Sequence, residues 1–426
     1  MLQKGRAWKF SFYGVIVICV ALMAPPSGRA EGTAGLRSHS HNVEKLLREL
    51  WGDDRLVDPV SQQGQQARGL YFNGPMQRRM GARGIIRAVK GANLDAVVLD
   101  LKDGQGRVMW DSKIDVLQPQ KRSFVKDLPG LIAKLKAAGI YTIGRIVCFT
   151  DPKLPRNHPD RAVLDNHPKR KGQVWATTGH RNPWLDPYNR KNHDLIVEMA
   201  REAQAVGLDE VQLDYIRFPV DEATRFAVFP AQVETPRREV LLGLLKRIDE
   251  AITIPLGVDV FGLTAFRTGD PAGLGQSLED WARHIEVFTP MLYINGMTHW
   301  VRDTGQGRAM RLINAAVKNL RRRLGHGPVI RPFIQAFPQG ADYYTGEFIA
   351  EQVRGARYGG ADGFLFWHPA SNYSTVRVGM NGPGRGLAPF PLEERYWWRR
   401  QAWGDRMSSP RRAAYWSNTK PDQYTQ

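Results

Sequence analysis

Residues 190–219 read RKNHDLIVEMAREAQAVGLDEVQLDYIRFP, and this stretch joins a helical pattern to a short strand. Apolar residues recur within 190–206 at the spacing of one helix face. Gly207 follows, and a glycine ends a helix in the left-handed conformation without a Cβ clash. The run 210–215 then has the length and composition of a strand. A helix followed directly by a strand predicts an α/β fold with a parallel sheet.

The same alternation continues in both directions along the chain. Strands are predicted at 69–73, 96–101, 142–149, 210–215, 256–261, 287–293, 329–336 and 363–368. Helices are predicted at 78–92, 123–138, 190–206, 235–251, 276–285, 308–324 and 345–358. Eight strands over roughly 300 residues predict a single (β/α)8 TIM barrel. The competing fold, a doubly wound open sheet, normally has a glycine-rich phosphate loop after its first strand, and LYFNGP at 70–75 is not one.

The 426-residue chain divides into four predicted segments. Residues 1–30 are predicted to be a signal peptide, because a basic start precedes an apolar run at 10–24 and the segment ends in Gly28-Arg29-Ala30. The apolar run is shorter than the roughly 20 residues of a membrane-spanning helix. A short extension and linker at 31–66 then lead into the barrel at 67–376. We therefore expect a periplasmic or extracellular protein; an uncleaved N-terminal anchor is the alternative, and it too leaves the barrel outside the cytoplasm.

The fourth segment, 377–426, is a basic tail that contains the aromatic and arginine-rich run YWWRR at 396–400. The formal net charge of the chain is +18, and removal of residues 1–30 lowers it to +14. We expect such a tail to contact an anionic glycan or membrane surface. The alternative is a closing helix at 396–403 that packs across the barrel base. No helix-turn-helix, zinc-finger or RNA-binding pattern is present, so a nucleic acid partner is not expected.

The cysteines and histidines are too few and too scattered for an internal disulfide or a zinc site. Cys19 lies in the predicted signal peptide, so the mature chain keeps only Cys148 and forms no internal disulfide. The ten histidines are scattered and place no pair at a strand end, whereas a zinc site needs clustered ligands. We expect no catalytic metal and no cofactor.

Polar residues recur where the predicted strands end, which is where a TIM barrel places its active site. Asp214 and Asp259 each interrupt an apolar strand, and these two strands are neighbours in the barrel. A buried carboxylate is unfavourable unless it is paired or used. Glycoside hydrolysis needs two such groups, one to protonate the leaving oxygen and one as nucleophile or base. The alternative for each aspartate is a buried ion pair with Arg145 or Arg217.

Other residues at the strand ends are candidates for substrate binding. The aromatic ones offer flat faces on which sugar rings stack. For Asp100 and Asp103 a structural role competes, because Lys102 lies between them and Asp-Gly is a common turn. The candidates are Tyr71, Asp100, Lys102, Asp103, Arg145, Tyr215, Arg217, Tyr293, Gln335, Trp367 and His368.

The strand sequences together resemble a known family. VVLDLKDGQGRVMW, GRIVCFTDP, EVQLDYIRFP, GVDVFG, FTPMLY and DGFLFWHPASNY resemble the bacterial putative glycosyl-hydrolase domains, TIM barrels distantly similar to the alpha-amylase and alpha-galactosidase superfamily. The resemblance covers about 67–376, and LDYIRFP at 213–219 is its most specific motif. It implies a nucleophile at Asp214. The superfamily usually has a glutamate as the acid on the fifth strand, where this chain offers Asp259.

Two functions agree with these observations. The first is an exported glycoside hydrolase that cleaves O-glycosidic bonds of a bacterial polysaccharide through Asp214 and Asp259. The second is a non-catalytic carbohydrate-binding barrel that scaffolds a surface-polysaccharide or cell-wall machine. Such a scaffold keeps the aromatic residues but does not need both carboxylates, so their joint presence favours the enzyme.

The signal-peptide prediction has a direct test. Cleavage after Ala30 makes Glu31 the first residue of the mature protein. N-terminal sequencing of the exported protein should therefore begin at or near Glu31, and a start at Met1 would contradict cleavage.

Overall fold

The computed structural model describes residues 60–122, 124–177, 182–220, 224–297, 305–325 and 327–385. The predicted signal peptide, and the tail beyond residue 385, lie outside these ranges. No helix within them is long and apolar enough to cross a bilayer.

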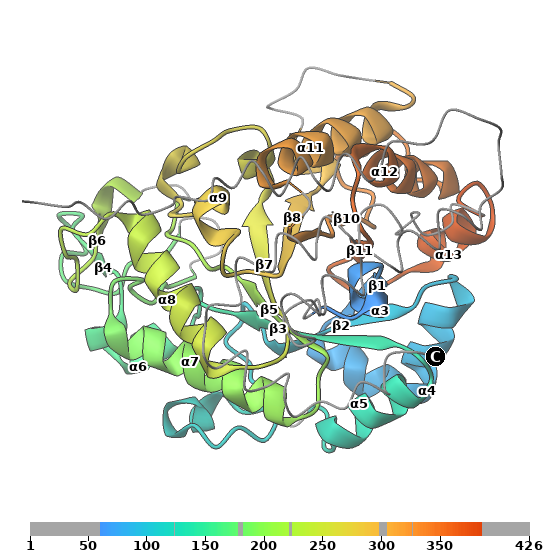
Figure 1. Ribbon diagram of the computed structural model, residues 1–426. Helices are drawn as coiled ribbons and strands as arrows, with labels where there is room; N and C mark the ends of the chain where they lie inside the picture. Colours follow the sequence, from blue (N-terminus) through green and yellow to red (C-terminus); the bar gives the residue numbers. More distant parts are fainter. Residues whose placement is uncertain are drawn as a thin grey trace, which may run out of the picture. The chain divides into compact units, whose positions relative to one another are not determined.

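Parallel strands close into a barrel at the centre of the molecule, with helices around it (Figure 1). The barrel strands follow the order of the sequence, and β10 pairs with both β8 and β11 to complete the ring. The strands are β1 (Arg68–Phe72), β2 (Ala96–Lys102), β3 (Tyr141–Val147), β5 (Glu210–Asp214), β7 (Leu256–Phe261), β8 (Val287–Leu292), β9 (Val329–Ile330), β10 (Phe333–Gln335) and β11 (Phe364–Trp367). The predicted (β/α)8 barrel is confirmed.

The predicted seventh strand, 329–336, is divided into β9 and β10. Pro332 lies between them and has no amide hydrogen to donate to the sheet. The Arg331 amide still donates to the Phe288 carbonyl at 2.9 Å, and the Leu365 amide donates to the Pro332 carbonyl at 2.9 Å. The two short strands therefore occupy one position in the barrel.

Every predicted helix is present, although several boundaries differ. The helices are α4 (Gly74–Gly91), α5 (Leu128–Ala137), α7 (Arg190–Ala205), α8 (Arg237–Ala251), α9 (Leu278–Trp281), α11 (Arg308–Leu324) and α12 (Gly346–Gly359). Helix α4 begins before the predicted residue 78, because the Asn73 side chain caps it by accepting from the Met76 amide at 3.0 Å. Helix α13 (Ser374–Asn381) packs against α12 and was not predicted.

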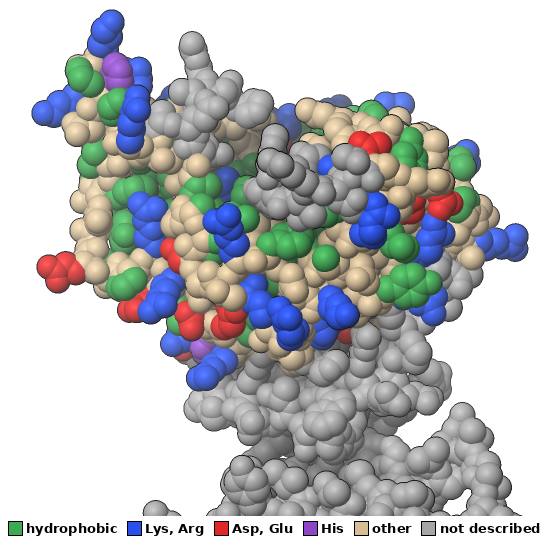
Figure 2. All heavy atoms as spheres, turned by 90° about the horizontal axis from the view of Figure 1, so that it is seen from above, with side chains coloured by type: hydrophobic (Ala, Val, Ile, Leu, Met, Phe, Trp, Pro, Cys, Tyr) green, Lys and Arg blue, Asp and Glu red, His purple; other side chains and the backbone are tan. Residues whose placement is uncertain are grey.

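Short strands and short helices lie at the two ends of the barrel. The loops after β3 and β5 meet in an antiparallel pair formed by β4 (Leu164–Asp165) and β6 (Ala227–Val228). Short helices α6 (Leu154–Asn157) and α10 (Ile294–Met297) lie in the loops after β3 and β8, and α3 (Gln62–Gln65) precedes β1. Figure 2 views the molecule from the side of α11 and α12, where Lys and Arg side chains recur with Asp and Glu between them.

A buried ion pair fills the end of the barrel where the strands begin. Arg331 and Glu210 are both fully buried, and the Arg331 guanidinium donates to Glu210. The same guanidinium donates to the Gly64 carbonyl of α3 at 2.7 Å, while the Tyr141 hydroxyl donates to Glu210 at 3.2 Å. A Cβ on Gly64 would lie 2.7 Å from the Tyr141 hydroxyl, so α3 needs glycine there to fit against the barrel.

Removing one member of this pair should destabilise the barrel more than removing both. Glu210→Leu leaves a buried, unpaired guanidinium, which should lower the free energy of unfolding by about 3–5 kcal/mol. The double variant Glu210→Leu with Arg331→Met should recover much of that loss. Urea unfolding of the three proteins measures the difference; equal losses for the single and double variants would contradict the interpretation.

Candidate active site

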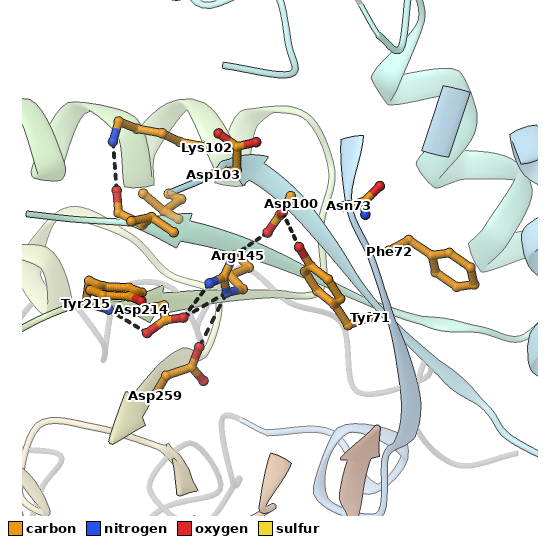
Figure 3. Close-up of polar contacts among 12 residues, drawn as sticks. Tyr71, Phe72, Asn73, Asp100, Lys102, Asp103, Arg145, Asp214, Tyr215 and Asp259 are labelled. Carbon is orange, nitrogen blue, oxygen red and sulfur yellow. Dashed lines mark hydrogen bonds and ion pairs between the residues drawn. The ribbon is translucent and has the colours of Figure 1, made fainter. Parts of the chain in front are cut away.

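One arginine gathers three carboxylates at the end of the barrel where the strands finish (Figure 3). Arg145, on β3, donates from Nη1 to Asp100 on β2 at 2.5 Å and from Nε to Asp214 on β5 at 3.0 Å. Its Nη2 also donates to Asp214, and its Nε lies 3.7 Å from Oδ2 of Asp259 on β7. All four side chains are buried. The strand-end residues predicted from the sequence therefore converge on a single charged cluster.

The two predicted catalytic carboxylates have different surroundings. Both oxygens of Asp214 are engaged, since Oδ2 accepts from Arg145 and Oδ1 accepts from the Tyr215 amide at 2.6 Å. Neither oxygen of Asp259 has a hydrogen-bond partner among the described residues, although the side chain is only 1% exposed. Burial and the neighbouring charge of Asp214 raise the pKa of Asp259 well above its usual value. The site thus pairs an ion-paired carboxylate with a carboxyl group that favours protonation.

Asp100 completes the cluster on the other side of Arg145. The Tyr71 hydroxyl donates to Asp100 Oδ2 at 2.5 Å, and the Arg145 guanidinium lies 5.5 Å from the centre of the Tyr71 ring. Burial raises the pKa of Asp100 to about 6, although the Arg145 charge opposes the shift. Asp100 and Tyr71 together hold the arginine in place.

Tyr215 follows Asp214 in an uncommon backbone conformation. Its φ is +51°, in the left-handed region that residues other than glycine rarely adopt. Such strained residues cost roughly 1–3 kcal/mol and cluster at functional sites. Here the turn ends β5 and lets the Tyr215 amide donate to the Asp214 carboxylate.

A pocket of about 250 Å³ opens beside Asp214 and Asp259. Its wall is mainly aromatic and methionine side chains, with few polar groups. The remaining lining residues are Tyr215, Arg217, Phe261, Gly262, Gln276, Met291, Tyr293, Gly296 and Met297. A cavity with two carboxylates and a mostly apolar wall has the composition expected of a small-ligand site.

Aromatic rings from several strand ends lie next to the charged cluster. Trp367 lies 6.1 Å from Tyr71 and 5.4 Å from Tyr293, measured between ring centres. Phe337 joins this group at 5.5 Å from Trp367. The predicted aromatic surface is therefore assembled from β1, β11 and the residues that follow β8 and β10.

Arg217 contacts a second set of rings. Its guanidinium lies 4.8 Å from the ring centre of Trp184 and 5.2 Å from that of Tyr215, and its Nη1 donates to the Phe218 carbonyl at 3.0 Å. The ion pair given above as the alternative role of Asp214 is thus present, with Arg145, whereas Arg217 lines the pocket through stacked contacts.

Eight predicted binding residues do not line the pocket. Tyr71, Asp100, Arg145 and Trp367 belong to the charged and aromatic clusters beside it, and the other four lie elsewhere. Lys102 is fully buried in an ion pair with Asp151 at 3.0 Å. A register shift lies between Asp100 and Lys102, so the Lys102 side chain does not join Asp100 in the charged cluster. Asp103 accepts the amides of its own turn. Gln335 is buried and donates to the carbonyls of the loop after β10. His368 accepts from the Ala370 amide at 2.9 Å, outside the pocket.

Several residues that line the pocket, and Trp184 beside Arg217, were not predicted from the sequence. Gln276 accepts from the Phe261 amide at 2.9 Å and so ties the loop before α9 to the end of β7. Nothing in the sequence indicated that Met291 and Met297 line a pocket, because methionine is a common core residue. Trp184 belongs to the long segment between β3 and α7, for which no element was predicted.

A family model described as "Putative glycosyl hydrolase domain" matches residues 69–373, which include every barrel strand but the first residue of β1. The chain belongs to this family. The resemblance identified from the strand sequences is thereby confirmed, and with it the class of glycoside hydrolase. No curated protein matches the chain.

One solved structure shows the same fold, and two others are similar to this chain. The glycoside hydrolase domain of PgaB (BpsB) from Bordetella bronchiseptica is 15% identical, with a TM-score of 0.54; the match covers 74% of this chain and 99% of that one. A hypothetical protein from Ruminiclostridium thermocellum is 29% identical over 45% of this chain and 97% of its own, with a TM-score of 0.39. An alpha-galactosidase from Thermus thermophilus is 14% identical over 72% and 59%, with a TM-score of 0.45.

The charged cluster predicts a stability that depends on pH. Arg145→Met leaves three buried carboxyl groups without their shared cation, so the free energy of unfolding should fall by about 3–5 kcal/mol at pH 7. The loss should shrink as the pH falls, because the folded variant then takes up protons that the unfolded chain binds less tightly. Denaturant titrations at pH 7 and pH 5 measure it; a loss independent of pH would show that packing dominates.

Proposed function

We propose that this barrel hydrolyses O-glycosidic bonds of a bacterial polysaccharide by a retaining mechanism, with Asp214 as nucleophile and Asp259 as general acid. The single observation that carries the proposal is the contrast between these carboxyl groups in one pocket. Retaining enzymes hold such a pair about 5–5.5 Å apart, whereas inverting enzymes need roughly 6.5–9.5 Å. Asp214 and Asp259 each place an oxygen within 3.7 Å of the same arginine nitrogen, which favours the shorter spacing.

The roles follow from the surroundings of each group. Arg145 donates two hydrogen bonds to Asp214 and orients the oxygens that would attack an anomeric carbon. Asp259 is buried without a hydrogen bond among the described residues and favours its neutral form, the form that donates a proton. Pairs of carboxyl groups whose surroundings separate their pKa values are typical of glycosidases.

In the first step, Asp259 donates its proton to the glycosidic oxygen as the bond to the anomeric carbon breaks. An oxygen of Asp214 forms the new bond to that carbon and gives a covalent glycosyl intermediate. In the second step, Asp259 accepts a proton from water, which attacks the anomeric carbon and releases Asp214. Arg145 Nε, 3.7 Å from Asp259, stabilises the carboxylate that exists between the two steps.

The aromatic cluster supplies the surface for the sugar rings. Tyr293 lines the pocket and lies 5.4 Å from Trp367, so a chain bound across them would reach Asp214 and Asp259 from one side. Rings of this kind stack on the apolar faces of sugars. The polymer would bind the enzyme outside the cytoplasm, because residues 1–30 are predicted to be a signal peptide.

The scaffold function remains the second candidate, because the Arg145–Asp214 ion pair suits a structural carboxylate as well. Asp259 separates the two proposals. A scaffold gains nothing from a buried carboxyl group that has no hydrogen bond among the described residues, because such burial is unfavourable in itself.

The proposal predicts that both carboxyl groups are essential. Asp214→Asn and Asp259→Asn should each lower kcat on a cleaved polysaccharide by at least about 10²-fold, because an amide neither attacks nor donates an acidic proton. Asp194→Asn, in an exposed ion pair with Arg247 on α8, is the matched control and should retain activity. Release of reducing ends from a panel of bacterial exopolysaccharides gives the rates.

Two further readouts assign the roles. The wild-type rate should fall as the pH rises through the raised pKa of Asp259, because the acid loses its proton. NMR of the first product should show the anomer of the substrate. Near-wild-type turnover by Asp214→Asn would refute the nucleophile, and an inverted first product would refute the retaining mechanism.

A further inference from the structure

Helix α4 presents a row of cations to solvent. Arg78, Arg79, Arg83, Arg87 and Lys90 are all exposed, and α4 contains no acidic residue. None of the five has an ion pair among the described residues; Lys90 donates to the Gly139 carbonyl at 3.3 Å. We call these five residues the α4 ladder.

Three members of the ladder lie along one side of the second part of the helix. Gly81, with φ of +56°, divides α4, and Arg83, Arg87 and Lys90 lie beyond it at spacings of four and three residues, on one face. Like charges at these spacings destabilise a helix by a few tenths of a kcal/mol per pair. The opposite face of α4 is apolar, with Ile85 and Val89 buried. The cations therefore form a single-sign strip that packing of the helix does not require.

Neighbouring elements extend the positive charge. The Asn381 side chain of α13 donates to the Gly91 carbonyl at 2.8 Å, so α13 meets the end of α4, and it contributes the exposed Arg377. Helix α5 packs on the other side with the exposed Lys134. The face of α11 and α12 in Figure 2 differs, because Asp and Glu occur there among the cations.

The ladder begins next to the candidate active site. Helix α4 follows β1 directly, so its first turn lies at the barrel end that holds Arg145 and the three carboxylates. The Asn73 cap donates to the Pro369 carbonyl at 3.0 Å, just after Trp367 of the aromatic cluster. Beyond Gly81 the second part of the helix, residues 82–91, extends about 15 Å along the outside of the barrel.

From these observations we propose that the α4 ladder binds an acidic polysaccharide, the polymer whose bonds the active site cleaves. The inference rests on the proposed function for the identity of the polymer. Carboxylate or sulfate groups along the chain would pair with Arg83, Arg87 and Lys90 while another part of the chain occupies the pocket. A lipid surface fits less well, because the apolar residues of α4 face the core and leave no side chain to insert.

Equilibrium binding to polygalacturonate tests the ladder without any need for turnover. The variant Arg83→Gln/Arg87→Gln/Lys90→Gln should bind about tenfold more weakly than wild type at low salt, with a smaller dependence of affinity on salt. The matched control Lys191→Gln/Arg238→Gln/Lys246→Gln removes three exposed cations from α7 and α8, where acidic residues intervene, and should bind like wild type. Arg83→Lys/Arg87→Lys should retain binding, and neutral dextran should not bind.

Asp214→Asn separates this inference from the proposed function, because it should lose turnover but keep full affinity for polygalacturonate. Equal affinity of the ladder variant and wild type would overturn the inference, as would an equal loss in the control variant. Duplex DNA, and vesicles of equal parts phosphatidylcholine and phosphatidylglycerol, are the other probes. Ladder-dependent binding to either of them, without binding to polygalacturonate, would also overturn it.

Discussion

The barrel depends on buried ion pairs between side chains of its different strands. Two guanidinium groups lie buried in it. Arg331, where the strands begin, pairs with Glu210, and Arg145, where they end, contacts three carboxylates from other strands. An unpaired ion at either place would be several kcal/mol unfavourable, so the strands that supply the partners must be in register. Between the two groups, Gln212 donates to Thr289 at 3.0 Å, which continues the polar interior. These polar and charged side chains therefore help to determine the register of neighbouring strands. In an apolar interior, packing alone would determine it.

The two ends use this arrangement differently. Around Arg331, Glu210 receives hydrogen bonds from both the guanidinium and Tyr141, and the group is closed off by α3. Around Arg145 the carboxylates outnumber the cation, and Asp259 has no hydrogen bond among the described residues. One end therefore has one carboxylate for its one cation and the other has three, which is the asymmetry expected of a barrel whose stability and chemistry lie at opposite ends.

Much of this could be predicted because parallel strands bring their carboxyl ends together. Asp100, Arg145, Asp214 and Asp259 were placed at strand ends, and the strand order makes them neighbours. Lys102 was misplaced because the register shift after Asp100 has no sequence signal. Trp184 lies in a long connection, where no periodicity predicts direction. Gln276 was predicted as the first residue of a helix, but the helix begins at Leu278 and leaves Gln276 in the loop that lines the pocket. The sequence left open whether Arg145 or Arg217 would pair with Asp214, because the answer depends on the angles between the strands.

Helix α3 closes the barrel with residues far apart in the chain. The Gly64 carbonyl receives its hydrogen bond from Arg331, 267 positions later. At a synthesis rate of roughly 5–20 residues per second, the acceptor emerges from the ribosome tens of seconds before its donor exists. The Gly64 carbonyl has no Arg331 donor during that interval, so this hydrogen bond between α3 and the barrel can form only after Arg331 has been synthesised.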